Sequence, residues 1–257
     1  MKKPDYVAIA KEYMSGVLDG SVPACSFVKQ AVQRQLNDLR RWGPEGGDYY
    51  FDEKEASRPC WFIENLTHTK GELAGRAIHL EPWQCFLLTT LFGWKAKAGN
   101  RRFRSAYVEV GRGNGKSTLL SGIGLFCLCA DHEPGAEVYS FATTREQAKI
   151  VFGDAQTMAR GNRALQEAYG LEVTAHALYV PATNSTFQAK SAEGSTLDGL
   201  NTHLAIIDEL HAHKKRDVFD VVETSLGKRR NSLMVSITTA GVDRTGIWKH
   251  LCVGREK

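Results

Sequence analysis

The stretch YVEVGRGNGKST, from Tyr107 to Thr118, decides the fold class of this 257-residue chain. Its three glycines let backbone N–H groups curl around phosphates without clashes from Cβ atoms, and an apolar helical segment follows immediately. Lys116 can reach the β- and γ-phosphates of a nucleotide, and the Ser117 hydroxyl can bind Mg²⁺. Val110 occupies the first glycine position of the usual G-x-x-x-x-G-K-[ST] pattern, so that glycine comes one residue late. The strand before and the helix after still favour a phosphate-binding loop over a chance glycine-rich turn.

Arg112 places a guanidinium inside the same loop. It can clamp γ-phosphate oxygens or it can face solvent, and the loop sequence alone does not choose between the two. We expect the nucleotide-binding residues of the loop to be Gly111, Arg112, Gly113, Asn114, Gly115, Lys116, Ser117 and Thr118.

From Phe103 onward, strand-like runs alternate with helical segments. We expect strands at 106–110, 136–142, 203–207 and 233–238, with two shorter strands within 171–190. We expect helices at 143–160 and 217–226. This alternation predicts an α/β fold with a mainly parallel central sheet flanked by helices. The ligand should then lie beyond the carboxyl ends of the strands.

The N-terminal part of the chain has a helical pattern instead. Residues 23–42 place apolar side chains at three- and four-residue spacings, which predicts an amphipathic helix. Pro82 opens another expected helix at 81–94, and the run Trp61–Ile63 is expected to be buried. We therefore expect a helical N-terminal segment at 1–75 and a nucleotide-binding core at 76–257.

An apolar run at 203–207 ends in two adjacent acids, Asp208 and Glu209. At the end of a strand, Asp208 can complete the Mg²⁺ shell opposite Ser117, and Glu209 can polarise an attacking water. An Asp-Glu pair after a strand is also a common solvated turn. The phosphate loop about 90 residues upstream favours the catalytic interpretation.

Hydroxyl groups follow the last expected strand in the sequence SITTAG, from Ser236 to Gly241. Such hydroxyls can sense whether a γ-phosphate is present and pass that information to a neighbouring segment. They can equally cap the helix that follows. Both interpretations stay open from this segment alone.

Together these motifs resemble the large terminase subunit of tailed bacteriophages, the ATP-driven motor that packages DNA into proheads. The resemblance covers about residues 75–250 and rests on the loop, the acidic pair and SITTAG. PWQ at 82–84 followed by LFG at 91–93 is similar to the family's adenine-contacting element. DELH at 208–211 and LDGL at 197–200 resemble the branch typical of long-tailed temperate phages.

The resemblance implies a P-loop NTPase of the RecA-like (ASCE) class that uses ATP and Mg²⁺. Lys116 and Ser117 would form the Walker A pair and Asp208 would be the Walker B aspartate, so Ser117 and Asp208 would hold the metal ion. Glu209 would be the catalytic carboxylate.

Further roles follow from the same resemblance. Gln84 would contact the adenine base, and Arg112 would join Lys116 at the phosphates during catalysis. Thr238 and Thr239 would couple hydrolysis to movement.

Many terminases carry a Leu-Arg-Gly element shortly before Walker B, and its arginine acts in trans on the neighbouring subunit. The corresponding triplet here is Leu197-Asp198-Gly199, so that arginine is absent from this place. The candidates for a replacement are Arg216, Arg229 and Arg230, and the sequence does not choose among them.

Family members continue into an RNase H-like nuclease domain. This chain ends at Lys257, just past the expected coupling motif, which leaves no room for that domain. We therefore expect the ATPase half alone, either an engineered fragment or a truncated prophage gene, with no nuclease activity.

The composition is that of a globular protein, with 42% hydrophobic and 24% charged residues. It excludes a disordered tail, a collagen-like rod and a small disulfide-stapled scaffold. With 33 Lys+Arg against 29 Asp+Glu the net charge is only +4, so DNA binding has to come from local clusters. Two basic clusters, 95–104 and 211–230, can each face duplex DNA. The alternatives are a solvated loop for the first and a subunit-contact or surface helix for the second.

The six cysteines form no CxxC pair, and we expect buried free thiols in a reducing cytosol. His203, His211 and His213 surround the acidic pair in sequence but lack a full tetrahedral ligand set, so we expect them to be second-shell or structural residues. The sequence has no signal peptide and no apolar run of membrane-spanning length, which favours the host cytoplasm.

The expected function is the ATPase motor of a phage large terminase, driving double-stranded DNA into proheads. Its expected partners are the portal or prohead and the small terminase subunit. We expect a homo-oligomeric ring when it is active, or a monomer in isolation. Two alternatives remain: a RecA-like DNA helicase or translocase, and a non-catalytic nucleotide- or DNA-binding prophage remnant. Intact Lys116, Asp208 and Glu209 argue against a decayed site.

Overall fold

The computed structural model describes residues 3–42, 47–142, 145–191, 199–208 and 217–239. The chain divides into two compact units, the first formed by residues 1–65 and 77–103 and the second by residues 66–76 and 104–257. This division differs from the expected boundary between residues 75 and 76. The helix at 82–93 belongs to the first unit because it packs against the helices at 6–19 and 53–64.

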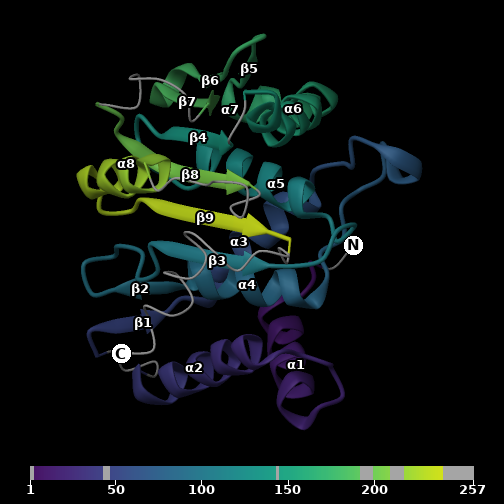
Figure 1. Cartoon of the computed structure of the whole chain (residues 1–257), viewed down its shortest axis with the longest axis vertical. Helices are drawn as coiled ribbons and strands as arrows, with labels where there is room; N and C mark the ends of the chain where they lie inside the picture. The colour runs from purple at the N-terminus through teal and green to yellow at the C-terminus, as the bar shows by residue number, and fades with distance from the viewer. Residues whose placement is uncertain (1–2, 43–46, 143–144, 192–198, 209–216, 240–257) are drawn as a thin grey trace. The chain divides into compact units, whose positions relative to one another are not determined.

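The first unit contains four helices and a two-stranded sheet in its described residues (Figure 1). The helices are α1 (Tyr6–Asp19), α2 (Ser26–Trp42), α3 (Glu53–Glu64) and α4 (Pro82–Gly93). Strands β1 (Tyr49–Phe51) and β2 (Trp94–Ala96) pair antiparallel. The helices expected at 23–42 and 81–94 are therefore confirmed.

The prediction that the whole run Trp61–Ile63 is buried is wrong for one residue. Phe62 and Ile63 are buried, but Trp61 is 46% exposed on the outer side of α3. The Lys3 ammonium lies 5.1 Å from the centre of its ring, a cation–π contact that a surface tryptophan can make. Consecutive residues of a helix point in different directions, so an apolar triplet cannot be buried as a whole against one neighbour.

The second unit is built on a seven-stranded sheet in the order β3-β9-β8-β4-β7-β6-β5 (Figure 1). Its strands are β3 (Ser105–Glu109), β4 (Glu137–Ala142), β5 (Glu172–Val173), β6 (Leu178–Val180), β7 (Ser185–Ser191), β8 (Thr202–Asp208) and β9 (Leu233–Thr238). The first five strands in that order run parallel, and β6 pairs antiparallel with both β7 and β5. The predicted mainly parallel α/β fold is confirmed, although 171–190 holds parts of three strands instead of two.

Helices cover both faces of this sheet. Helices α5 (Lys116–Cys129) and α6 (Arg145–Gly161) pack on one face, while α8 (Asp217–Ser225) covers the other. Helix α7 (Arg163–Tyr169) follows α6. The short 3₁₀ helices are η1 (Gly71–Leu73), η2 (Pro181–Thr183) and η5 (Leu226–Lys228).

Five of the six cysteines lie in the described residues. Cys60, Cys85 and Cys127 are buried free thiols, as expected, whereas Cys25 is exposed and Cys252 lies outside the described residues. Burial raises the pKa of the Cys129 thiol to about 12. No helix in the described part of the chain combines the length and apolar character needed to cross a membrane.

Helix α5 approaches the sheet closely at Gly124, where a Cβ atom would come within 2.6 Å of the Phe187 ring. We expect Gly124→Ala to lower the free energy of unfolding by about 1–3 kcal/mol, because the buried ring has to shift. Gly153→Ala in α6 is the matched control, since a Cβ there meets nothing within 4 Å. Urea denaturation followed by circular dichroism measures both, and an equal gain in stability for the two variants would contradict this close packing.

Candidate functional site

The glycine-rich loop connects β3 to α5. Gly113 and Gly115 have φ angles of 81° and 68°, in the left-handed region that favours glycine. The Asn114 side-chain amide donates to the carbonyls of Gly111 at 3.1 Å and Arg112 at 3.3 Å, which closes the loop on itself. Residues 111–115 are exposed. The loop therefore presents the positive end of a 14-residue helix to an anion.

The parallel ladders bring three predicted motifs to one edge of the sheet. Strand β9 pairs with β3, where Glu109 lies opposite Thr238, and with β8, where Asp208 lies opposite Ile237. The loop leaves β3 at Val110, and the Val110 N–H donates to the Thr238 carbonyl at 3.1 Å. The glycine-rich loop, Asp208 and Thr238 thus follow or end adjacent strands at their carboxyl ends (Figure 1).

Asp208 lies on the face of the sheet that α5 covers. Ile206, two residues earlier and therefore on the same face, lies next to Gly124 of α5. Lys116 and Ser117 begin that helix, so Asp208 and Ser117 belong to the same side of the sheet. Asp208 is only 8% exposed. A buried carboxylate and a hydroxyl at a helix start offer the oxygen ligands that Mg²⁺ prefers.

Thr238 is oriented differently. It lies opposite Glu109 in the ladder, two residues beyond Ser236, which pairs with Tyr107 on the face covered by α8. Its hydroxyl donates to the Thr239 carbonyl at 3.1 Å, and both threonines are buried. In this structure Thr238 therefore contacts the loop through its backbone carbonyl, which a sequence motif of hydroxyls does not suggest.

Gln84 belongs to the other unit, in the first turn of α4. Its Oε1 accepts the Glu81 N–H at 2.9 Å and completes a capping box, and the residue is only 7% exposed. Pro82 at the start of the helix and this box explain why α4 begins here. The proposed contact of Gln84 with adenine stays a prediction.

Several expected site residues lie outside the described residues, namely Glu209, Arg216, His211 and His213. Arg112 is exposed, which agrees with either of its two interpretations. The described part of the acidic motif ends at Asp208.

Of the three arginine candidates, Arg229 is occupied within its own chain. Its Nε donates to the Asn201 carbonyl at 2.8 Å, and Nη1 contacts Glu133 at 2.9 Å and the Pro134 carbonyl at 3.1 Å. Nη2 donates to the Gly135 carbonyl. The side chain is 11% exposed. It joins the segments that precede β4, β8 and β9, at the amino ends of the strands, so Arg229 is a structural residue and we remove it from the candidates.

Most cations of the basic cluster at 95–104 also make contacts within the chain. Lys95 pairs with Glu55 at 3.4 Å and Arg102 with Asp38 at 2.9 Å. The buried Arg101 guanidinium lies 4.7 Å from the centre of the Phe92 ring, and Arg104 donates to the carbonyls of Leu226 and Arg229 and to the Ser232 hydroxyl. Four of the five cations therefore make intramolecular contacts, and only Lys97 resembles the solvated loop residue that sequence leaves as an alternative.

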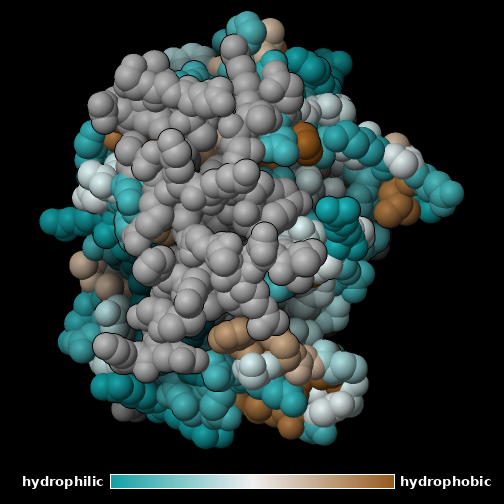
Figure 2. Space-filling model, in the orientation of Figure 1, coloured by the Kyte–Doolittle hydropathy of each residue, from teal (hydrophilic) through white to brown (hydrophobic). Residues whose placement is uncertain are grey.

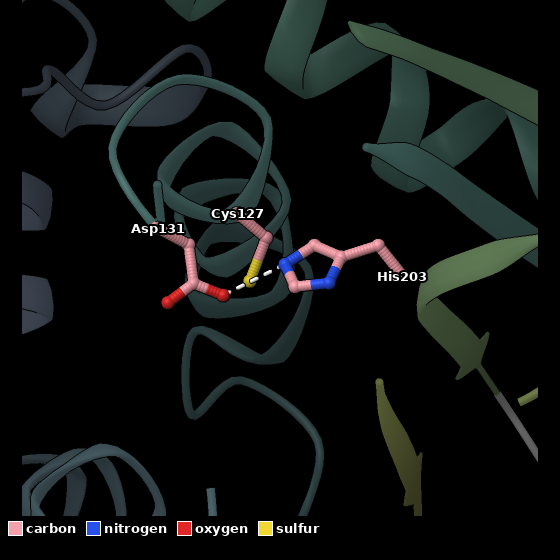
Figure 3. A group of neighbouring side chains, drawn as sticks. All are labelled: Cys127, Asp131 and His203. Carbon is pink, nitrogen blue, oxygen red and sulfur yellow. Dashed lines mark hydrogen bonds and ion pairs between the residues drawn. The ribbon is translucent and has the colours of Figure 1, made fainter. Parts of the chain in front are cut away.

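His203 is structural and lies far from the phosphate loop along β8. Its Nε2 lies 2.7 Å from Oδ2 of Asp131, with both side chains buried, at the amino end of β8 (Figure 3). Cys127 completes a group of three whose ligand atoms lie within 4.8 Å of one another. Two ligands of a tetrahedral zinc ion would be about 3.3 Å apart, so the shorter His–Asp separation fits a hydrogen-bonded pair.

Comparisons with known proteins agree with the motifs. Residues 82–253 match the family model of the terminase large subunit, ATPase domain. The chain is 31% identical over 194 residues to the terminase large subunit of Enterobacteria phage HK97, covering 73% of this chain and 38% of that protein. It is 22% identical over 232 residues to the terminase large subunit of Lactococcus phage p2, covering 88% of this chain and 42% of that protein.

A solved structure is similar as well. The crystal structure of the HK97 bacteriophage large terminase matches with a TM-score of 0.65 at 29% identity, over 79% of this chain and 42% of that chain. The chain thus spans less than half the length of these relatives.

The contacts of Arg229 predict a difference between two neighbouring arginines. We expect Arg229→Ala to lower the free energy of unfolding by about 2–4 kcal/mol, because it leaves Glu133 and several carbonyls without their donor. Arg230→Ala, at an exposed position, should change stability by less than about 0.5 kcal/mol. Denaturant unfolding of both variants measures this, and equal stability would restore Arg229 as a candidate for action in trans.

Proposed function

The chain belongs to the family of terminase large-subunit ATPase domains, and on this premise we propose that it hydrolyses ATP to drive double-stranded DNA into a phage prohead. The observation that carries the proposal is the double ladder of β9, because it joins the phosphate loop, Asp208 and the coupling segment at one edge of the sheet. We place this activity in the host cytoplasm.

Nucleotide binding begins with the helix end and the loop. The N–H groups at the start of α5 and the Lys116 ammonium would neutralise phosphate charge, while Arg112 would reach the γ-phosphate from the exposed loop. Ser117 and Asp208 would hold Mg²⁺, which supplies further charge neutralisation at the phosphates when bound. Gln84 would contact the adenine base.

Hydrolysis then needs a positioned water. Glu209 follows Asp208 directly, and we assign it to orient and deprotonate the attacking water. Charge also develops on the γ-phosphate in the transition state, and a further arginine stabilises it in many related motors. With Arg229 removed, Arg216 and Arg230 are the candidates to act on the neighbouring subunit of a ring.

Coupling would use the backbone bond between Val110 and Thr238. A loop that moves when phosphate leaves would change this hydrogen bond and shift the segment that begins at Thr239. The portal or prohead and the small terminase subunit are the proposed partners of the assembled ring.

The role of Glu209 is tested by separating binding from turnover. We expect Glu209→Gln to lower the rate of ATP hydrolysis by about 10²–10⁴-fold, because the amide cannot accept the proton of the water. Binding of a fluorescent ATP analogue should stay within about threefold, since the loop is unchanged. Lys116→Ala is the control that should lose both, and turnover unchanged in Glu209→Gln would contradict the mechanism.

The trans arginine is tested by mixing two inactive variants. Arg216→Ala and Arg230→Ala are each assayed alone, and the one that loses about 10³-fold or more activity is the candidate. Mixed with Glu209→Gln subunits it should recover activity, because intact Glu209 and the intact arginine then meet at mixed interfaces. The wild-type rate should also rise more steeply than linearly with protein concentration. No recovery together with a linear rate would contradict a ring completed in trans.

A further inference from the structure

Helix α2 has an outward face made of basic and amide side chains. At 100° per residue, Lys29, Arg34, Arg40 and Arg41 fall within one arc of about 140°. The amide residues Gln30, Gln33 and Asn37 occupy the positions between them, and all these side chains are exposed. In the lower left of Figure 2, where Figure 1 places α2, the surface is hydrophilic.

The orientation of this face is determined by the buried side of the helix. Val32 packs with Met14 and Val17 of α1 in an apolar cluster. Gln35 accepts the Trp94 indole N–H at 2.7 Å, and Asp38 pairs with Arg102 at 2.9 Å. Asp38 is the only acid of α2, so the outward face carries four cations and no carboxylate.

Helix stability accounts for only part of this charge. Arg40 and Arg41 lie in the last turn, where cations interact favourably with the helix dipole. That explanation does not extend to Lys29, which lies near the positive end of the helix, or to Arg34 in its middle. Lys29 has no acid at i±4 on α2, whereas Asp38 lies four positions after Arg34 and also pairs with Arg102. Repulsion among like charges costs free energy in the unbound protein. Such a cost is expected on a surface that binds an anionic partner.

The composition of the face indicates what that partner is. A protein interface has an apolar core, but here Phe27 at the border of the face is the only exposed apolar side chain of α2. Arginine, lysine, asparagine and glutamine are the side chains that contact DNA phosphates. Lys29 and Arg40 are eleven positions apart, about 16 Å along the helix, a length over which duplex DNA presents about ten phosphates.

Two of the arginines are also positioned. The Arg34 guanidinium lies 4.9 Å from the centre of the Phe103 ring, and that of Arg41 lies 4.5 Å from the Trp42 ring. Stacking fixes the plane of a guanidinium, which favours directed contacts to phosphate oxygens. All four cations of the outward face are exposed, whereas Arg101 is buried and Lys95 and Arg102 are partly buried.

We propose that the outward face of α2 binds the phosphate backbone of double-stranded DNA. The proposal rests on the proposed function, which requires a DNA-contacting surface, and it gives the N-terminal helices a role. Contacts to phosphates hold the duplex without reading its sequence, which suits a motor that moves along any DNA.

The test is the salt dependence of DNA binding by the whole chain. Anisotropy of a labelled duplex of about 30 base pairs is measured between roughly 50 and 300 mM NaCl for wild type and the double variant Lys29→Gln/Arg40→Gln. Losing two phosphate contacts should lower the salt slope by about 1.8 and the affinity at 0.1 M salt by about 60-fold. Both substitutions are at exposed positions, so the melting temperature should stay near that of wild type.

Helix α6 offers a matched control. Lys149→Gln/Arg160→Gln removes the same two charge types, at exposed positions again eleven residues apart and again with an arginine in the last turn of a 17-residue helix. We expect wild-type DNA binding from it. Equal losses in the two double variants, an unchanged slope for the α2 variant, or no duplex binding by wild type would overturn the proposal. The proposal would also be overturned if the α2 variant lost binding to poly-glutamate, an anionic polymer that is not DNA, while its binding to the duplex was unchanged.

ATP hydrolysis measured without DNA separates this proposal from the function on which it rests. The α2 variant should retain the wild-type rate, because none of its residues lies in the nucleotide site. If no variant and no wild-type preparation hydrolyses ATP while the α2 variant still loses DNA binding, the proposed motor fails and the DNA surface stands. If the α2 variant hydrolyses ATP normally and its DNA binding is unchanged, the DNA surface fails and the proposed motor stands.

Discussion

The hydrogen-bonded ladders on the two sides of β9 are the constraint on which the rest of the nucleotide site depends. One ladder holds β3 and the loop after it, and the other holds β8 and Asp208. Because parallel strands end at the same edge, residues about 90 positions apart in the chain become neighbours there. The Val110–Thr238 hydrogen bond extends the ladder into the loop, so the loop and the end of β9 share one backbone connection.

The two edges of this sheet carry different kinds of side chain. At the carboxyl edge, the loop is exposed and its glycines adopt left-handed conformations. At the amino edge, Arg229 joins three strand-leading segments and His203 pairs with Asp131. Buried polar groups need partners to offset the loss of hydration, and the amino edge supplies them. The amino edge stabilises the scaffold, while the glycine-rich loop at the opposite edge is exposed.

The same reasoning separates two kinds of basic residue in the chain. Cations that are partly withdrawn from water, such as Arg101 and Arg102, lie against aromatic rings or carboxylates. Those of the outward face of α2 project into water from a helix whose opposite side is packed. A local count of lysines and arginines cannot distinguish the two kinds, because they differ in whether the charged group is buried against other side chains or exposed to water.

The sequence by itself determined the fold class, the phosphate loop and the order of strands and helices, because hydrophobic periodicity and glycine positions are local properties. It also determined the helices at 26–42 and 82–93 within a few residues. Only the tertiary structure decided that α4 belongs with α1 and α3, that Trp61 is exposed and that β9 separates β3 from β8. It likewise decided that Arg229 is structural and that Thr238 meets the loop through its carbonyl. The physical reason is that burial, strand order and hydrogen-bond partners depend on contacts between residues distant in sequence, on which no local pattern reports.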